Sequence, residues 1–272
     1  MDKTTLLGLA LGFIAIFGGA VLDGTPLPSL ISIPAFLIVI VGTIGATVLS
    51  NPVERVRRAP ALIRCAFFER GQSGSDLIDL IVNLAMKARR DGVLSLESEA
   101  EEVDDLFLRR GIQLVVDGAD DQVIRKVLEA DMATTAERHR AGYAMFDMMG
   151  GFAPTLGILG AVMGLIHVLT EVNDPTKLAA GIAVAFVATL YGVGTANLIY
   201  FPIGNKLRSK SEDEQHLRSL MLQGVLAIQA GDNPRLVRDK LEIYLAPKDR
   251  GNSQTSNGEA QASSAATAVE AV

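Results

Sequence analysis

The sequence lacks several features on which enzymes, metal sites and nucleic-acid binders depend. Its single cysteine, Cys65, cannot form a disulfide bond within the chain. Its three histidines, His139, His167 and His216, do not stand at the spacings of metal ligands, and no glycine-rich nucleotide-binding loop stands out. The isoelectric point of about 5.2 argues against a general nucleic-acid binder. We therefore expect no enzyme activity, no cofactor, no bound metal and no nucleic-acid partner.

Charged residues are also missing from four long stretches of this 272-residue chain. The stretches without aspartate, glutamate, lysine or arginine are Leu6–Leu22, Gly24–Val53, Met148–Thr170 and Leu178–Asn205. A helix that crosses a bilayer needs about 20 mostly apolar residues, and each stretch reaches or approaches that length. The alternative, buried core helices of a soluble protein, rarely requires four such stretches. The sequence predicts an all-α polytopic membrane protein with four transmembrane helices and a cytoplasmic helical domain.

The first stretch could also belong to a cleaved signal peptide. Only one cation, Lys3, precedes it, beside the acidic Asp2, and a second apolar stretch follows almost at once. Signal peptides carry a marked basic region before the apolar one. We therefore expect the first stretch to be a transmembrane helix.

The distribution of lysine and arginine predicts how the chain is oriented. The connection 23–32 contains neither residue, and the connection 171–177 contains only Lys177. Cations flank the other ends of the stretches, at Arg55, Arg57, Arg58, Arg138, Arg140, Lys206, Arg208 and Lys210. Because cytoplasmic loops are rich in lysine and arginine, we expect both termini and the long middle segment to be cytoplasmic.

The middle segment has the pattern of a helical bundle. Ser75 is placed to cap a helix over 76–90, and Gly92 is placed to end it in a left-handed conformation. Ser95 begins a further helix whose first turns are rich in glutamate, the charge that a helix N-terminus favours. Residues 121–147 can continue unbroken into the third apolar stretch. The apolar face expected on the first of these helices is Leu77, Ile78, Ile81, Val82, Leu84 and Ala85.

The end of the chain combines amphipathic helices with a polar tail. Residues 207–230 are amphipathic, and Pro234 suits the first turn of a short final helix to Leu245. From Gly251 on, small and polar residues without an apolar period indicate disorder. The expected organisation is a transmembrane hairpin over 1–50, a cytoplasmic helical domain over 51–147, a second hairpin over 148–205, cytoplasmic helices over 206–247 and a disordered tail over 248–272.

The predicted spans contain no titrating group that could carry an ion through the membrane. They hold no carboxylate or ammonium, and His167 lies near the outer end of the third span. Threonine hydroxyls can polarise water or an ion but cannot store a proton at physiological pH. If ions cross the membrane here, a partner must supply the titrating group.

The spans contain small residues that allow close helix packing, and two prolines that disturb the helix. Gly160 and Gly164, like Ala188 and Gly192, stand four apart, the spacing that lets helices approach each other, whether in one chain or between chains. Each proline inside a helix frees the carbonyl four residues before it. Pro154 and Pro202 therefore predict either simple kinks or water-lined points near a pore.

Four segments together resemble one known family. They are Ala-Pro-Thr-Leu-Gly-Ile-Leu-Gly-Ala-Val-Met-Gly-Leu-Ile over 153–166, Ala-Val-Ala-Phe-Val-Ala-Thr-Leu-Tyr-Gly over 183–192 with its continuation to Pro202, Ala-Ile-Gln-Ala-Gly-Asp-Asn-Pro over 227–234, and Ala-Arg-Arg-Asp-Gly-Val-Leu-Ser-Leu-Glu over 88–97. In this order and spacing they are similar to segments of the MotA/PomA flagellar motor stator subunits. The resemblance covers about the first 250 residues, although the first two spans agree only in hydropathy.

The resemblance implies a motor part of the bacterial inner membrane that is not an enzyme. In the family, five A subunits surround two copies of a MotB/PomB-type subunit, whose single span carries the ion-binding aspartate. Ion passage is thought to rotate the A ring, whose cytoplasmic domain pushes the rotor protein FliG. The implied partners are thus a B-type subunit, FliG, further copies of this chain and membrane lipid.

The resemblance also implies roles for particular residues. Arg89 and Glu97 align with the two family charges that engage the rotor, and Arg90 could share that role. Without the resemblance, these charges would read as ordinary solvated surface groups.

Five further positions align with the family's ion pathway. Pro154 and Pro202 align with prolines that couple ion flow to movement, and Thr189 with a threonine that faces the ion site. Sodium-driven members usually have hydroxyls at the positions of Ala161 and Ala188. The absence of these hydroxyls from this chain favours H⁺ over Na⁺ as the transported ion.

Two alternatives remain open from the sequence. An ExbB/TolQ-type energiser also forms a ring around an aspartate-bearing span, but it has three spans and an external N-terminus. A self-contained transporter or channel would need its own polar site in the middle of the membrane, which these spans lack.

Overall fold

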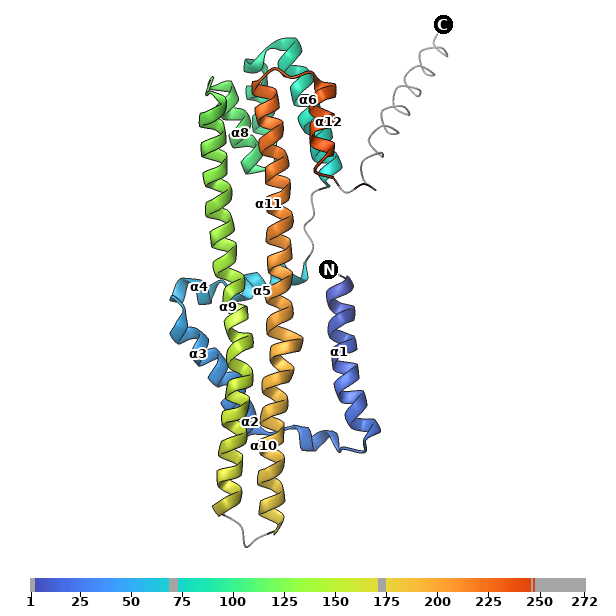
Figure 1. Cartoon of the computed structure of the whole chain (residues 1–272), viewed down its shortest axis with the longest axis vertical. Coiled ribbons are helices and arrows are strands. Elements are labelled where there is room, and N and C mark those ends of the chain that lie inside the picture. Colours follow the sequence, from blue (N-terminus) through green and yellow to red (C-terminus); the bar gives the residue numbers. More distant parts are fainter. Residues whose placement is uncertain (1–2, 69–72, 171–174, 246, 248–272) are drawn as a thin grey trace, which may run out of the picture. The chain divides into compact units, whose positions relative to one another are not determined.

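The computed structural model describes residues 3–68, 73–170, 175–245 and 247, and every regular element in these ranges is helical (Figure 1). The predicted all-α class is therefore confirmed. The tail predicted over 248–272 lies outside the described residues.

The chain divides into two units. Unit 1 comprises Met1–Glu69 and Glu137–Ser211, and unit 2 comprises Arg70–Ala136 and Glu212–Val272. Two long helices, α9 (Asp121–Thr170) and α11 (Phe201–Gln229), contribute residues to both units. The continuation of 121–147 into the third apolar stretch is confirmed, because α9 is one helix of 50 residues.

Unit 1 contains the apolar helices. Besides parts of α9 and α11, its elements are α1 (Lys3–Leu22), η1 (Leu27–Leu30), α2 (Ile33–Phe36), η2 (Leu37–Val41), α3 (Gly42–Ser50), α4 (Val53–Arg57), α5 (Ala59–Phe67), α10 (Pro175–Thr195) and η4 (Ala196–Tyr200). Among the described residues, three helical segments are long and apolar enough to cross a membrane, namely Leu27–Ser50, Asp121–Thr170 and Gly181–Gln229. Leu7–Leu22 is a shorter apolar helix. The membrane class is thus supported, and the count of four spans stays a prediction.

Two of the apolar helices contain π-helical turns that the sequence did not predict. One is η2, between α2 and α3, and the other is η4, between α10 and α11. At the end of η4 the Phe201 N–H donates to the Ala196 carbonyl, five residues back. The next residue, Pro202, has no N–H to donate. The wider turn therefore lets one continuous helical path pass a proline, and such turns are frequent at functional sites.

The helices α9 and α10 pack backbone to backbone along a row of small residues. A Cβ placed on Gly192 would stand 2.6 Å from the Ala153 carbonyl oxygen, and one on Gly157 would stand 3.0 Å from the Ala188 carbonyl oxygen. Further along, Gly164 meets Ala185 in the same way, at 3.1 Å. The predicted close approach is confirmed, and the small residues of the two helices face each other within one chain.

Unit 2 is a helical bundle around one core. Its elements are α6 (Gly74–Asp91), η3 (Val93–Ser95), α7 (Leu96–Glu102), α8 (Leu106–Val116), the beginning of α9, most of α11 and α12 (Pro234–Glu242). The apolar face predicted for α6 is confirmed, since all six of its residues are buried in this core. The core also takes side chains such as Leu108, Ile124, Leu220 and Val237 from the other helices.

Some predicted helix ends are wrong. Ser75 lies inside α6, because the helix begins at Gly74 and the Leu77 N–H already donates to the Ser73 carbonyl. Gly92 does end α6 with a positive φ of 88°, but its ψ of 160° is extended and not left-handed helical. The final helix starts at Pro234 as predicted, with the Asn233 side chain as its cap, but stops at Glu242 before Leu245.

The contact between α9 and α10 generates a stability prediction. Replacing Gly192 by alanine puts a Cβ against backbone atoms that cannot rotate away, so we expect a loss of about 1–3 kcal/mol, as for other overpacked sites. The measurement is the midpoint of thermal unfolding of the purified protein in detergent. Gly194, two residues further along α10, has open space around its Cβ position. Gly194→Ala is the matched control, and equal midpoints for the two variants would contradict the proposed packing.

Candidate functional site

Two groups of residues are candidates for function, and each lies within one unit. The first is the set predicted for the ion pathway in unit 1, and the second is the set of charges near Gly92 in unit 2. Among the described residues, no cluster of histidine, cysteine, aspartate or glutamate could hold a metal ion.

Pro154 and Thr189 lie at the contact between α9 and α10. The Pro154 Cα is 3.1 Å from the position of a Cβ on Gly192, and the Thr189 Cα is 3.4 Å from that of a Cβ on Gly157. Both side chains are half-buried. The structure therefore brings the predicted coupling proline of α9 near the predicted ion-facing threonine of α10.

The Thr189 hydroxyl retains the capacity to bind water or an ion. It donates to the Ala185 carbonyl oxygen at 3.3 Å, at the long end of hydrogen-bond distances. A hydroxyl also has two acceptor lone pairs, which can accept a hydrogen bond from water or coordinate a cation. Thr189 can therefore assist ion passage without being an acid or base itself.

The two alanines differ in their surroundings. Ala188 is fully buried in a cluster with Ala35, Val39 and Val187, so α2 and η2 cover it. Ala161 is half-buried on α9, one residue after Gly160. Ala188 thus lines no open surface of the chain, whereas its neighbour Thr189 is half-buried.

The second proline is linked to the first through a packing contact. Pro202 is exposed on α11, and its neighbour Phe201 packs on Gly150, where a Cβ would stand 2.5 Å from the Phe201 Cε1. Gly150 is the residue whose carbonyl Pro154 leaves without its helical partner. A glycine at 150 therefore lets this part of α9 touch the start of α11.

An ion pair joins α9 and α11 near the charged ends of these apolar stretches. The Arg208 Nη2 lies 2.6 Å from the Asp147 Oδ2, and the guanidinium stands 4.9 Å from the centre of the Tyr143 ring. No local pattern of the sequence indicates this pair, because its members are 61 positions apart.

The second group stands at the exposed turn between α6 and α7. Arg89 and Arg90 occupy the last turn of α6, Glu97 lies in the first turn of α7, and all three are exposed. Gly92 and the short η3 connect the two helices. The structure thus brings cations and an anion to one turn at the surface of unit 2.

The two arginines are not equivalent. Arg90 makes a forked pair with its neighbour Asp91, at 2.9 Å and 2.8 Å. The hydrogen bonds from Arg90 lower the pKa of Asp91, and the same bonds raise the pKa of Arg90. In the described part of the chain, neither Arg89 nor Glu97 has an ion-pair partner. Of these three residues, Arg89 and Glu97 are therefore the two whose charges are open to an external partner.

A second ion pair, which the sequence did not predict, links α6 and α7. Lys87 of α6 donates to the Glu99 carboxylate of α7, and both side chains are about one-third exposed. Each member stands two residues from a candidate contact residue, Lys87 from Arg89 and Glu99 from Glu97. The pair therefore joins the two helices that carry Arg89 and Glu97.

The chain is similar to known proteins over most of its length. Residues 99–247 match the model of the MotA/TolQ/ExbB proton channel family, and residues 6–92 match that of the motility protein A N-terminal region. Motility protein A of Bacillus subtilis (strain 168) is 41% identical, over 92% of this chain and 93% of its own. Chemotaxis protein PomA of Vibrio alginolyticus is 37% identical, over 90% and 96% respectively.

Solved structures show the same similarity in three dimensions. A chain of the flagellar MotAB stator complex from Bacillus subtilis has a TM-score of 0.86 at 41% identity, with 91% of this chain and 98% of that one covered. A chain of C. jejuni MotAB has a TM-score of 0.87 at 30% identity, with 91% and 97% covered. This chain therefore belongs to the MotA/TolQ/ExbB proton channel family, in its MotA/PomA branch of flagellar motor stator subunits.

Proposed function

We propose that this chain is the A subunit of a flagellar stator that converts proton flow into torque. The observation that carries the proposal is the absence of any aspartate, glutamate, lysine or arginine from the four apolar stretches of a proton-channel family member. A carboxylate that takes up and releases protons must then come from a second protein. A MotB/PomB-type subunit, as in the MotAB complexes that this chain resembles, fits that requirement.

The proposed assembly is the one that the resemblance to the MotA/PomA family implies. Five copies of this chain surround two copies of the B-type subunit in the bacterial inner membrane, in contact with lipid. The chain has four spans, over the hairpins 1–50 and 148–205, with both termini in the cytoplasm. The absence of lysine and arginine from the connection 23–32 supports this orientation.

The ion passes beside the hydroxyl of Thr189, and movement is taken up at Pro154 and Pro202. The contact of Gly150 with Phe201 supports this role, because it connects the two proline-bearing segments. Ala161 and Ala188 supply no oxygen, so the pathway offers few ligands to a hard cation such as Na⁺, which prefers several oxygens. Ala188 is fully buried in this chain, so close packing is a second reason for a small residue at that position.

The cytoplasmic segment 51–147 delivers the torque. Arg89 and Glu97 make the contacts with the rotor protein FliG, and Arg90 contributes less because Asp91 already pairs with it. Exposed charge pairs contribute only about 0–1 kcal/mol each. Contacts of this strength can form and break at every step of a rotating motor.

Reconstitution into liposomes tests the stator proposal. We expect no proton flux with this chain alone, because it has no titrating group in its spans. Flux should appear when the chain is reconstituted with a B-type subunit, and should be lost when that subunit's membrane aspartate becomes asparagine. Proton flux through this chain alone would instead favour a self-contained channel.

Swimming under defined gradients tests the coupling ion. With the proton gradient collapsed by an uncoupler and a sodium gradient maintained, we expect cells driven by this stator to stop swimming. Sustained swimming under those conditions would show that the ion is Na⁺ while leaving the stator role intact.

Charge reversal tests the rotor contacts. We expect Arg89→Glu and Glu97→Lys each to slow swimming several-fold without loss of the protein from the membrane, and Arg90→Glu to have a smaller effect. The measurements are swimming speed and the amount of protein in membrane fractions. Arg235→Glu reverses another exposed cation of unit 2 and is the matched control. Normal swimming of a strain with alanine at positions 89, 90 and 97 would reject this assignment.

Variants of the Lys87–Glu99 ion pair test whether this pair positions Arg89 and Glu97. Glu99→Lys sets two cations against each other and should slow swimming by disturbing the turn that holds Arg89 and Glu97. The reciprocal double variant, Lys87→Glu with Glu99→Lys, restores the pair and should recover much of the speed. Equal defects in the single and the double variant would mean that Glu99 acts through its own charge and not through Lys87.

A further inference from the structure

Within unit 1, α9 and α11 meet along a row of four contacts, here called the seam. The seam pairs Gly150 with Phe201, Asp147 with Gly204, Tyr143 with Arg208 and His139 with Ser211. On each helix these residues stand three or four positions apart, which is the spacing of one helix face. Pro202 directly follows Phe201, and Pro154 stands four residues after Gly150. The seam therefore begins beside both prolines and runs away from them along both helices.

The two ends of the seam differ in the kind of contact they make. At the first end an aromatic ring packs on a glycine, because a Cβ on Gly150 would stand 2.5 Å from the Phe201 Cε1. At the other end the His139 Nδ1 lies 3.2 Å from the Ser211 Oγ. A ring on a glycine makes no directed bond, whereas a hydrogen bond holds its heavy atoms within about 3.2 Å of each other. The polar end therefore fixes the position of one helix along the other more closely than the apolar end does.

The ion pair of Asp147 with Arg208 is oriented by contacts on both helices. The Arg208 Nη2 lies 2.6 Å from the Asp147 Oδ2. A Cβ on Gly204 would stand 2.8 Å from the Asp147 Oδ1, so a glycine lets the carboxylate lie against the backbone of α11. The Arg208 guanidinium also stands 4.9 Å from the centre of the Tyr143 ring, within the range of a cation–π attraction. Each charged group thus has a second contact besides its partner.

The exposure of this pair makes a large contribution to stability a poor explanation for it. The side chain of Arg208 is 41% exposed and that of Asp147 is 33% exposed, and exposed ion pairs stabilise a protein little. The pair does restrict sliding. Packed helices shift past each other in many conformational changes, and a contact of 2.6 Å cannot survive a slide of one helical turn, about 5.4 Å.

We propose that Asp147 and Arg208 are positioning residues that keep α9 and α11 in register, so that movement at the two prolines passes along both helices together. This inference rests on the proposed function, in which Pro154 and Pro202 take up the movement. Without the pair, a bend at either proline slides one helix along the other, and less movement reaches the residues of α9 and α11 that belong to unit 2. Proton passage does not need the pair, because both residues lie outside the four uncharged stretches.

Exchanging the two charges tests this role in the full chain with its B-type partner. Asp147→Arg sets two cations against each other and Arg208→Asp sets two carboxylates against each other, whereas the double variant restores an ion pair. We expect each single variant to keep wild-type proton flux in liposomes but to slow swimming several-fold, and the double variant to recover most of the speed. Arg57→Asp reverses an exposed cation of α4 and is the matched control.

Proton flux in these variants also shows that they fold and assemble. Loss of flux together with swimming in the single variants would overturn the proposal, because the pair would then act in assembly or conduction. Equal swimming defects in the single and double variants would overturn it as well. A wild-type complex that neither conducts protons nor supports swimming would instead count against the proposed function.

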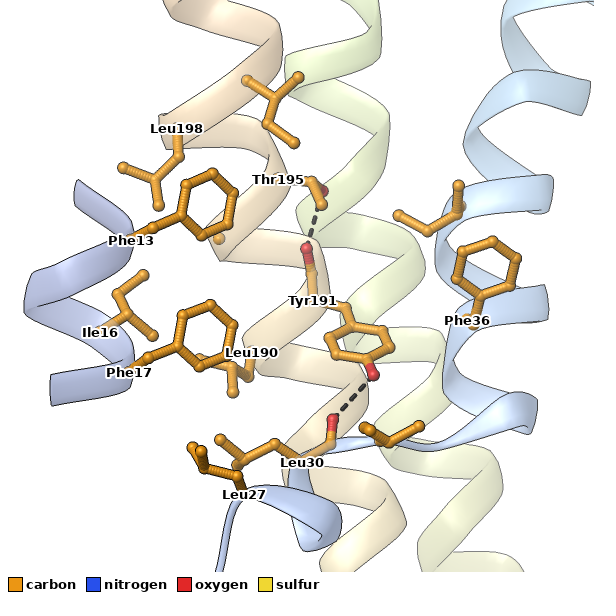
Figure 2. A pocket seen from close by; sticks show the side chains of 14 residues that line it. Phe13, Ile16, Phe17, Leu27, Leu30, Phe36, Leu190, Tyr191, Thr195 and Leu198 are labelled. Atoms are coloured by element: carbon orange, nitrogen blue, oxygen red, sulfur yellow. Dashed lines mark hydrogen bonds between the residues drawn. The ribbon is translucent and has the colours of Figure 1, made fainter. Parts of the chain in front are cut away.

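A second measurement depends on neither ion flow nor a rotor. Amide hydrogen exchange of the purified complex, followed by mass spectrometry, should be faster over residues 201–211 in each single variant and return toward the wild-type rate in the double variant. Tyr191→Phe is the control, since it removes the hydrogen bond of 2.7 Å from Tyr191 to the Leu30 carbonyl oxygen beside an apolar pocket of unit 1 (Figure 2). It should leave exchange over 201–211 unchanged. Wild-type exchange in both single variants would overturn the proposal, whatever their swimming speed.

Discussion

The backbone contact between α9 and α10 is the constraint on which unit 1 depends. Apolar side chains gain little from leaving lipid for a protein interior, so close packing must supply the stability that the hydrophobic effect gives in water. Gly157 and Gly192 allow that packing because they bring main-chain atoms of both helices together. As a result, the distance from Pro154 to Thr189 is set by backbone atoms and not by flexible side chains. An ion pathway built on this contact starts from fixed positions.

The prolines change the helices without ending them. Pro154 lies inside the unbroken α9, and Pro202 follows a π-helical turn that passes directly into α11. Each proline leaves a carbonyl without its usual donor, and such points are where a helix bends most readily. Because Gly150 packs on Phe201, a bend in α9 presses on the start of α11. The contact that connects the two helices therefore lies beside both prolines.

Unit 2 has a well-packed apolar core and, at the turn between α6 and α7, exposed charges that have no ion-pair partner among the described residues. Its helices share one large apolar core, and the Lys87–Glu99 pair closes the turn between α6 and α7. Arg90 is occupied by Asp91, which leaves Arg89 and Glu97 to the solvent. Unit 2 thus presents two exposed charges on a well-packed bundle, which is what the proposed weak contacts with a rotor require.

The sequence by itself determined the features that depend on local patterns. The uncharged stretches showed a membrane protein, the period of α6 identified its six buried residues, and four ordered segments identified the family. Only the tertiary structure decided which distant groups meet. Examples are the pairing of Asp147 with Arg208, the tie from Lys87 to Glu99 and the burial of Ala188 under α2 and η2. These contacts join residues far apart in the chain, and their geometry follows from how closely helices pack. No short-range period of the sequence encodes the geometry of these contacts.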